Sequence, residues 1–158
     1  MATIPVTKRG SDMLKEELHR LKTVERHAVI RASSEARAQG DLSENAEYEA
    51  AKDKQGFIEG RILEIDSKLA AAQIIDPSTL DAGGRVVFGA TVDLEEESSG
   101  QEVTYQIVGD DEADLKKGLV SISSPIARSM IGKEAGDVAE VQAPGGVKRY
   151  EIIEVRYV

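Results

Sequence analysis

The feature that most constrains this chain is a row of mostly apolar residues, between positions 51 and 72, that has the spacing of a coiled coil. Its members follow in alternating steps of four and three: Ala51, Gln55, Ile58, Ile62, Ile65, Leu69 and Ala72. That is the heptad pattern of helices that supercoil around a partner. An earlier helical row consists of Leu14, Leu18, Leu21, Ala28 and Ala32. Because only the residues around 40–43 connect the two rows, we expect an antiparallel coiled-coil hairpin over residues 1–76.

The predicted hairpin is a slim rod. Each helix should have about 28–30 residues, so that at ~1.5 Å per residue the rod is about 40–45 Å long. Large Ile and Leu side chains fill the predicted seam near its base, whereas Ala28, Ala32 and Ala51 occupy it toward the turn. Small seam residues let the helices approach closely, at a cost in buried apolar area. A slim tip would be unexpected in a rod whose only role is to be stable.

Beyond Asp76-Pro77 the apolar period changes from that of a helix to that of strands. The strand-like runs are 85–88, 90–94, 103–108, 119–122, 139–143 and 149–157. A short helical piece is expected at 125–132, and Pro144-Gly145-Gly146 reads as a hairpin turn. We therefore predict a linker at 77–84 and a small antiparallel sheet domain with one short helix at 85–158, which makes the chain α+β in class.

Composition limits the classes of function. The chain has no Cys, which excludes disulfides and thiolate metal sites. It shows no signal-peptide core and no run near the ~20 apolar residues of a membrane span, so we expect a cytoplasmic protein with no membrane partner. The net charge of −9 argues against broad affinity for nucleic acid. Residues 1–76 hold 12 Lys and Arg against 14 Asp and Glu, so any polyanion contact should fall there rather than in the more acidic remainder.

No self-contained enzyme site is visible in the sequence. The two His residues, His19 and His27, are eight apart on the first helix, which places them about 12 Å apart and too far to share a metal. We expect both to face solvent. No Gly-rich phosphate loop precedes a helix, and no Ser–His–acid triad is plausible when His is confined to the rod.

The turn of the hairpin, with the sequence GDLSENAEY from Gly40 to Tyr48, carries the residues of greatest interest. Gly40 ends the first helix in the manner of a C-terminal glycine. Asp41 and Glu44 have the spacing of a capping box for the second helix. Two carboxylates within one turn could instead supply part of a Mg²⁺ shell, which another protein's active centre would have to complete. The residues alone leave both interpretations open.

Basic residues lie around this tip: Arg31, Arg37, Lys52 and Lys54. A basic collar behind an acidic tip would suit contacts with the phosphates of a passing nucleic-acid strand. The competing interpretation is that these residues form ordinary surface salt bridges along the helices, such as Lys52 with Glu49. Tyr48 falls on the seam row, where we expect it to pack under the turn and support the tip.

Several motifs, in order along essentially the whole chain, resemble the Gre-type bacterial transcript cleavage factors. They are GDLSENAEYEAAK at 40–52, GFIEGRI at 56–62, GRVVFGATV at 84–92, IVGDDEAD at 107–114, SPIAR at 124–128 and GKEAGD at 132–137. The resemblance implies that the coiled coil enters the secondary channel of RNA polymerase. It also implies that the C-terminal domain has an FKBP-like fold and docks on the channel rim.

The resemblance further implies a role for the tip acids. Asp41 and Glu44 would help to hold a Mg²⁺ ion and the attacking water at the polymerase active site, where nascent RNA of a backtracked complex is hydrolysed near its 3′ end. The factor would have no cofactor of its own, would not be an enzyme by itself, and would act as a monomer. Ser43 and Lys52 stand where family members vary, and with a modest basic collar we expect fragments of two or three nucleotides.

Docking on the polymerase should use the Ser124–Gly132 segment. Ile126 and Met130 could form an apolar contact there or could equally be core residues. Two other functions compete: a channel-binding polymerase inhibitor of the same architecture, and an FKBP-like prolyl isomerase. The retained tip acids disfavour the inhibitor. The second half has few aromatics to line an isomerase pocket. A holdase chaperone would need a large apolar tip, which the sequence lacks.

Overall fold

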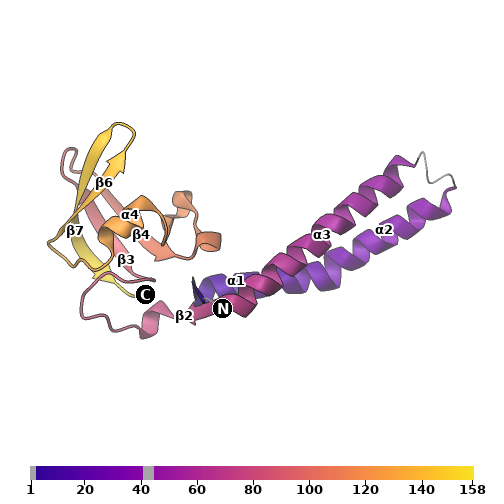
Figure 1. Cartoon of the computed structure of the whole chain (residues 1–158), viewed down its shortest axis with the longest axis horizontal. Coiled ribbons are helices and arrows are strands. Elements are labelled where there is room, and N and C mark those ends of the chain that lie inside the picture. The colour runs from indigo at the N-terminus through magenta and orange to yellow at the C-terminus, as the bar shows by residue number, and fades with distance from the viewer. Residues whose placement is uncertain (1–2, 41–44) are drawn as a thin grey trace. The chain divides into compact units, whose positions relative to one another are not determined.

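The computed structural model describes residues 3–40 and 45–158, which divide by their internal contacts into two units (Figure 1). The helical unit contains residues 11–72. The second unit contains residues 73–158 together with residues 3–10. In the described ranges, no helix is long and apolar enough to cross a membrane.

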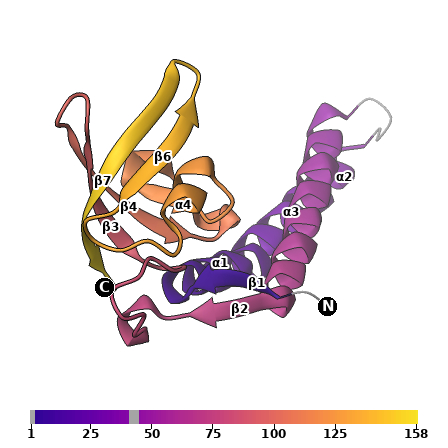
Figure 2. The same cartoon turned by 60° about the vertical axis from the view of Figure 1, so that its left-hand side comes forward.

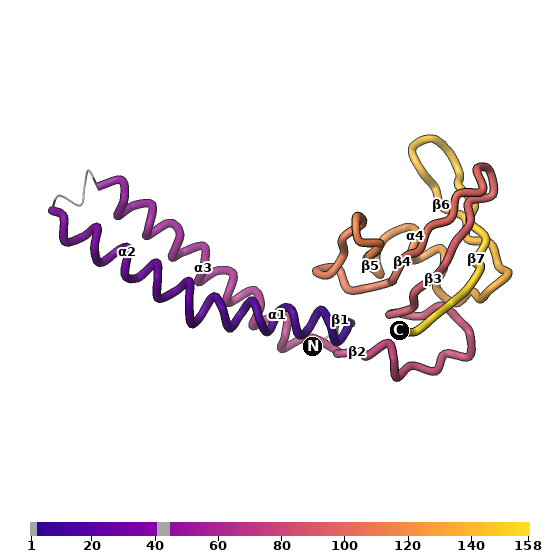
Figure 3. The backbone as a smooth tube through the Cα atoms, turned by 180° about the vertical axis from the view of Figure 1, so that it is seen from behind, coloured from indigo at the N-terminus to yellow at the C-terminus, as the bar shows by residue number. Residues whose placement is uncertain are grey.

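The helical unit is the predicted antiparallel hairpin. Its first arm runs through α1 (Lys8–Arg20), the π-helical turn η1 (Leu21–Glu25) and α2 (Arg26–Ala38), and its second arm is α3 (Ala46–Ala71). The trace in Figure 3 shows α2 and α3 side by side. The buried residues between the arms are Leu14, Leu21, Val29, Ala51, Ile58, Ile62 and Ile65. The heptad pattern thus predicted the second arm correctly.

The seam on the first arm departs from the prediction. Ala28 and Ala32, which were expected in the seam, are exposed, and Val29 and Ala36 are buried in their place. The cause is η1, where the backbone N–H of Arg26 bonds to the carbonyl of Leu21, five residues earlier. A π turn holds one residue more than an α turn, and an α-helix advances about 100° per residue. The seam therefore shifts by one position beyond Leu21.

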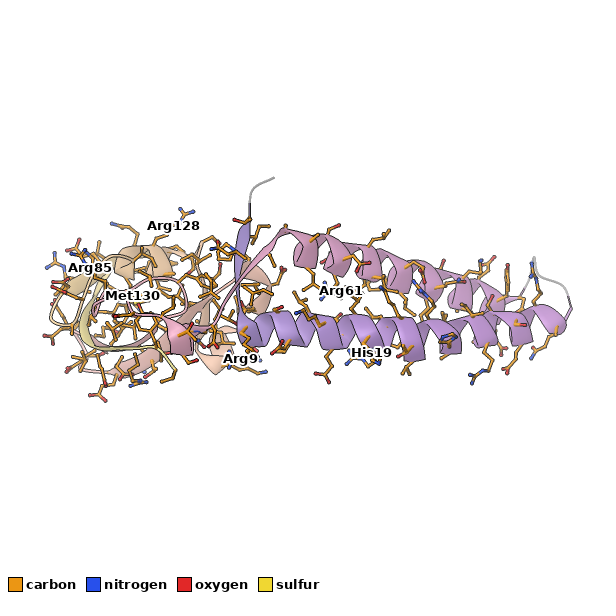
Figure 4. The ribbon with its side chains drawn as sticks, turned by 90° about the horizontal axis from the view of Figure 1, so that it is seen from below. Arg9, His19, Arg61, Arg85, Arg128 and Met130 are labelled. Carbon is orange, nitrogen blue, oxygen red and sulfur yellow. The ribbon has the colours of Figure 1, made fainter. Side chains whose placement is uncertain are left out.

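Two ion pairs between the arms lie on either side of this π turn. Arg26 donates two hydrogen bonds to Glu59, with N–O distances of 2.8 and 2.6 Å, and Arg61 donates two to Glu17, at 2.7 and 2.8 Å. In Figure 4, Arg61 lies between the arms while His19 points away from α3. The Arg26 bonds lower the pKa of Glu59, and the Arg61 bonds lower the pKa of Glu17. These ion pairs connect the two arms on both sides of the π turn.

The expected exposure of both histidines is confirmed, since His19 and His27 are each solvent-facing. Each lies outside any group of His, Asp or Glu that could hold a metal within residues 3–40 and 45–158.

The second unit is built on a five-stranded sheet in the order β5-β4-β3-β7-β6 (Figure 2). Its strands are β3 (Thr91–Glu96), β4 (Glu102–Val108), β5 (Leu119–Ser121), β6 (Val138–Ala143) and β7 (Gly146–Arg156). All neighbours are antiparallel except β4 and β5, which are parallel. Short 3₁₀ turns η2 (Pro77–Thr79), η3 (Asp110–Glu112) and η4 (Leu115–Lys117) and the helix α4 (Pro125–Met130) complete the unit. The α+β class is confirmed, and the parallel β4–β5 pair is the one departure from the expected antiparallel sheet.

One predicted strand is absent from the sheet. Residues 85–88 form no named strand, although Arg85 makes an isolated bridge to Glu134. The hydroxyl of Tyr157 donates to the carbonyl of Arg85 and accepts a 3.1 Å hydrogen bond from the backbone N–H of Val87. The backbone of Val86 pairs with the segment after α4: its N–H donates to the carbonyl of Lys133 at 2.7 Å, and its carbonyl accepts from the N–H of Gly132 at 2.8 Å. The run thus pairs its backbone groups without forming a strand. Val86 is fully buried all the same.

The core of the second unit lies between the sheet and α4. Its buried residues are Val86, Ala90, Val92, Leu94, Ile107, Val120, Ala127, Met130, Ala139 and Ile152. Val92 and Leu94 lie two apart on β3, as expected of a strand with one face on the core. Side chains packed against this core include Phe88, Tyr105, Tyr150 and Tyr157. The aromatic residues of this half are therefore used in packing.

Residues 3–10 join the second unit, which the sequence did not indicate. Their strand β1 (Ile4–Thr7) pairs with β2 (Ala72–Ile75), just before η2. The carboxylate of Glu112 accepts hydrogen bonds from the backbone N–H of Thr7, at 2.9 Å, and from the Thr7 hydroxyl. Because this side chain lies 105 positions away in sequence, local pattern could not reveal the contact.

Candidate functional site at the tip of the hairpin

The first arm ends as the sequence predicted. Helix α2 stops at Ala38, and the backbone N–H of Gln39 bonds to the carbonyl of Ala36 at 3.2 Å. Gly40 follows with a φ of +117°, a conformation that L side chains rarely adopt. Glycine has no such restriction, so it can end the helix and redirect the chain.

The second arm begins with a different cap from the one predicted. Helix α3 starts at Ala46, and the side-chain oxygen of Asn45 accepts a 3.0 Å hydrogen bond from the backbone N–H of Tyr48. Asn45 is therefore the N-cap, and the capping role predicted for Asp41 is wrong. Asp41 and Glu44 themselves lie outside the described residues.

Asn45 also contacts the first arm. Its side-chain nitrogen donates a 2.6 Å hydrogen bond to the carbonyl of Ala36, in the last turn of α2. The carboxamide of one residue thus bonds to both arms, close to the end of α2 and the start of α3. Sequence reasoning overlooked Asn45, although Asn is as good an N-cap as Asp and directly precedes the helical run.

Packing under the tip uses small residues. Ala36 on the first arm and Ala51 on the second are both buried, whereas larger Ile side chains fill the seam nearer the base. Tyr48 is half-buried on the first turn of α3, and its support of the tip stays a prediction. The distal seam is therefore slim, although Ala36 takes the place that the sequence suggested for Ala28 and Ala32.

The basic residues near the tip are exposed. Arg31, Arg37 and Lys52 have exposed side chains, and none forms an ion pair with any residue in the described ranges. In particular, Lys52 does not pair with Glu49, the partner suggested by the salt-bridge interpretation.

The described acids do not make a metal centre by themselves. Within residues 3–40 and 45–158, no three His, Asp or Glu side chains are grouped so that they could hold an ion. Glu47 and Glu49 lie in the first turn of α3. The pair that the sequence suggested as part of a Mg²⁺ shell, Asp41 and Glu44, lies outside the described residues, so its role as a ligand stays a prediction.

The residues suggested for docking on α4 have different environments. Met130 is fully buried in the core of the second unit, so it is a core residue and cannot be a surface contact. Ile126 is half-buried against the same core. In Figure 4, Met130 lies within the sheet unit and Arg128 points outward. Ile131 is 40% exposed, so it is an apolar side chain of this segment that solvent reaches.

A hollow of about 420 Å³ lies beside α4 and β6. It is lined by Arg128, Ser129, Ile131, Lys133, Val138 and Glu140. No aromatic side chain lines it, because those of this half pack on the core. The hollow therefore lacks the aromatic surface that a prolyl isomerase pocket was expected to need.

Fold and tip together define a class: an antiparallel helical hairpin with a polar, acid-bearing turn, joined to a small α+β sheet unit. Comparison with known proteins gives this class a family. Residues 4–74 match the model for "Transcription elongation factor, N-terminal", and residues 81–157 match that for "Transcription elongation factor, GreA/GreB, C-term". The chain belongs to the GreA/GreB family of transcription elongation factors.

Individual relatives agree with this assignment. The chain is 70% identical over 157 residues to the transcription elongation factor GreA of Verminephrobacter eiseniae, and 71% identical over 157 residues to that of Ralstonia nicotianae, covering 99% of both chains in each case. Among solved structures, it aligns with GreA factor homolog 1 of Thermus thermophilus at 25% identity and a TM-score of 0.43, over 98% of this chain and 99% of that one.

Proposed function

We propose that the helical unit enters the secondary channel of RNA polymerase and that its tip stimulates hydrolysis of the 3′ end of a backtracked nascent RNA. Arrested complexes would then resume synthesis. The observation that carries the proposal is the cap of α3: Asn45 fills it, so neither Asp41 nor Glu44 is needed there. Membership of the GreA/GreB elongation factor family supports the same conclusion.

In this proposal the tip acids complete a metal site that polymerase provides. Asp41 and Glu44 would hold Mg²⁺ jointly with the polymerase, and the bound ion would lower the pKa of a water and offset negative charge on the phosphate. The carboxylates would also accept hydrogen bonds from the attacking water and so orient it. Attack on phosphorus breaks the bond to the 3′ oxygen of the upstream RNA, which is left with a free 3′ hydroxyl.

The shaft and the collar suit this task. Alanines at positions 36 and 51 keep the distal seam slim, and the ion pairs of Arg26 and Arg61 connect the arms nearer the base. The exposed side chains of Arg31, Arg37 and Lys52 would contact phosphates of the backtracked strand. The polymerase would supply most of the catalytic machinery, so the chain acts as an accessory factor rather than as a nuclease.

Docking of the second unit would use the exposed surface of the Ser124–Gly132 segment. Ile126 remains a candidate contact there because it is only half-buried. Met130 has no part in it, since it is in the core. With a small basic collar we expect short products of two or three nucleotides, whose lengths can be read from the released RNA.

The test is Asp41→Asn, assayed with a stalled, backtracked polymerase complex by following cleavage at the RNA 3′ end. The charge needed for Mg²⁺ is removed, while the N-cap at Asn45 is untouched, so the melting temperature should be unchanged and cleavage should collapse. Glu47→Gln is the matched control, because it removes one exposed acid from the first turn of α3 and should leave cleavage intact.

The other outcomes decide between functions. Unchanged cleavage with Asp41→Asn would refute the role given to the tip acids. If the parent protein binds polymerase without supporting cleavage, the chain is instead an inhibitor that occupies the channel.

A further inference from the structure

The carboxamide of Asn45 is the one side chain in the described part of the tip that bonds to both arms of the hairpin. Its oxygen accepts from the backbone N–H of Tyr48 at 3.0 Å, and its nitrogen donates to the carbonyl of Ala36 at 2.6 Å. The same carbonyl also accepts from Gln39 at 3.2 Å. A direct bond therefore joins the last turn of α2 to the residue before α3.

The bond to Ala36 is more than the helix cap requires. An N-cap needs only an oxygen that accepts from the third helical residue, and Ser, Asp and Asn serve about equally well. Donation to a carbonyl on the other arm requires an N–H or O–H group as well. Asp has the shape of Asn but no donor when ionised, and it would place an oxygen against the Ala36 carbonyl. Ser has one polar atom on a shorter side chain.

We propose that Asn45 is a positioning residue, whose bond to Ala36 fixes the separation of the two arms where the tip segment leaves and re-enters the helices. This inference rests on the proposed function, because what it positions are the tip acids Asp41 and Glu44. Catalytic groups must be held closely, and a misplacement of about 1 Å can lower a rate by about 100-fold. The bond to Ala36 supplies a constraint from outside the segment that carries the acids.

The decisive variants separate the cap from the bond between the arms. Asn45→Ser and Asn45→Asp both retain an N-cap and lose the bond to Ala36, and the neutral Ser variant excludes added charge as the cause of any effect. Asn45→Ala loses both interactions. Hydrogen exchange at the Tyr48 amide reports on the cap directly: it should stay slow in the Ser and Asp variants and become faster in the Ala variant.

In the cleavage assay, the Ser and Asp variants should reach half of their maximal cleavage rate at the same factor concentration as the parent. Their maximal cleavage rate should fall by about 10- to 100-fold. The Mg²⁺ concentration needed for half-maximal cleavage should rise, because the carboxylates that contribute to the shell are less well placed. A residue that only stabilised the fold would change the melting temperature and leave the Mg²⁺ requirement as it was.

Asp41→Asn, measured alongside, distinguishes the two possible failures. If Asp41→Asn loses cleavage while Asn45→Ser keeps the parental rate and Mg²⁺ requirement, the positioning role is refuted and the proposed function stands. If neither variant affects cleavage, the role that the proposed function gives to the tip acids is refuted, and the positioning role of Asn45 is refuted with it. A loss in Asn45→Ser that is fully explained by a lower melting temperature or faster Tyr48 exchange would also overturn the positioning role.

Discussion

Replacing Glu112 with Ala should release residues 3–10 from the second unit. In the structure, the Glu112 carboxylate accepts hydrogen bonds from the backbone N–H groups of Thr7 and Gly109, each at 2.9 Å, and from the Thr7 hydroxyl. The hydroxyl oxygen in turn accepts from the backbone N–H of Gly10 at 3.1 Å. Thr7 is 1% exposed, so its donors cannot turn to bulk water without local opening.

The size of the effect follows from these donors. A buried donor left without an acceptor costs about 1–3 kcal/mol, and Glu112→Ala leaves both the N–H and the hydroxyl of Thr7 without theirs. We expect a loss of about 2–4 kcal/mol in the local free energy of opening, allowing for partial relaxation. Since 1.4 kcal/mol corresponds to a factor of ten, amide exchange at Thr7 and Gly10 should become about 30- to 700-fold faster.

Hydrogen exchange followed by NMR or mass spectrometry measures this opening residue by residue. Thr7→Val is the matched control, because it removes only the hydroxyl and keeps the backbone donor to Glu112. Exchange of the amide at position 7 should therefore increase less than in Glu112→Ala. Glu112→Gln retains an acceptor without the charge, so its exchange rates at Thr7 and Gly10 should lie between those of the parent and of Glu112→Ala. If Glu112→Ala leaves Thr7 and Gly10 exchanging as slowly as the parent, the carboxylate is not what holds this segment.

Two further predictions concern the helical unit. Deleting Thr23 from the π turn should restore steps of seven along the first arm, so the melting temperature, followed by circular dichroism, should not fall. Deleting Ala32 instead shifts Ala36 off the seam and should lower the melting temperature. Equal losses in the two variants would contradict this account of η1. Hydrogen bonds from Arg61 lower the pKa of Glu17. The contribution of the Glu17–Arg61 pair to the stability of the fold is therefore present above about pH 4.3, the usual pKa of a free Glu, and is lost as the pH falls further. Thermal melts from pH 5 to pH 3 should therefore show a smaller acid loss for Glu17→Gln, and an identical pH dependence would count against the pair.

Local sequence patterns predicted much of this fold because they report directly on periodic burial. The heptad row on α3 identified the buried face that contains Ile58, Ile62 and Ile65. Alternation in the second half located β3, β4, β6 and β7 to within a few residues. The pattern could not foresee the one-residue shift at η1, because a π turn conserves helical spacing on either side and only packing against α3 decides which residue enters the seam.

The tip shows the same limit at the scale of single side chains. Asp41 and Asn45 are both good N-cap residues, and spacing favoured Asp41 because Glu44 follows at the right interval. The start of α3 at Ala46 assigns the cap to Asn45. On α4, Ile126 and Met130 were equivalent in sequence, and only the packing of the helix on the sheet made Met130 a core residue.

By itself, then, the sequence determined the class of fold, the antiparallel hairpin and the position of an acid-bearing turn, since each depends on residue types at short intervals. The tertiary structure decided which residue caps α3, which face of the first arm is buried, and that Glu112 holds Thr7 across 105 positions. These features depend on groups that are distant in sequence and meet only when the chain has folded. No local propensity encodes such a meeting, because its free energy comes from hydrogen bonds and burial between the partners.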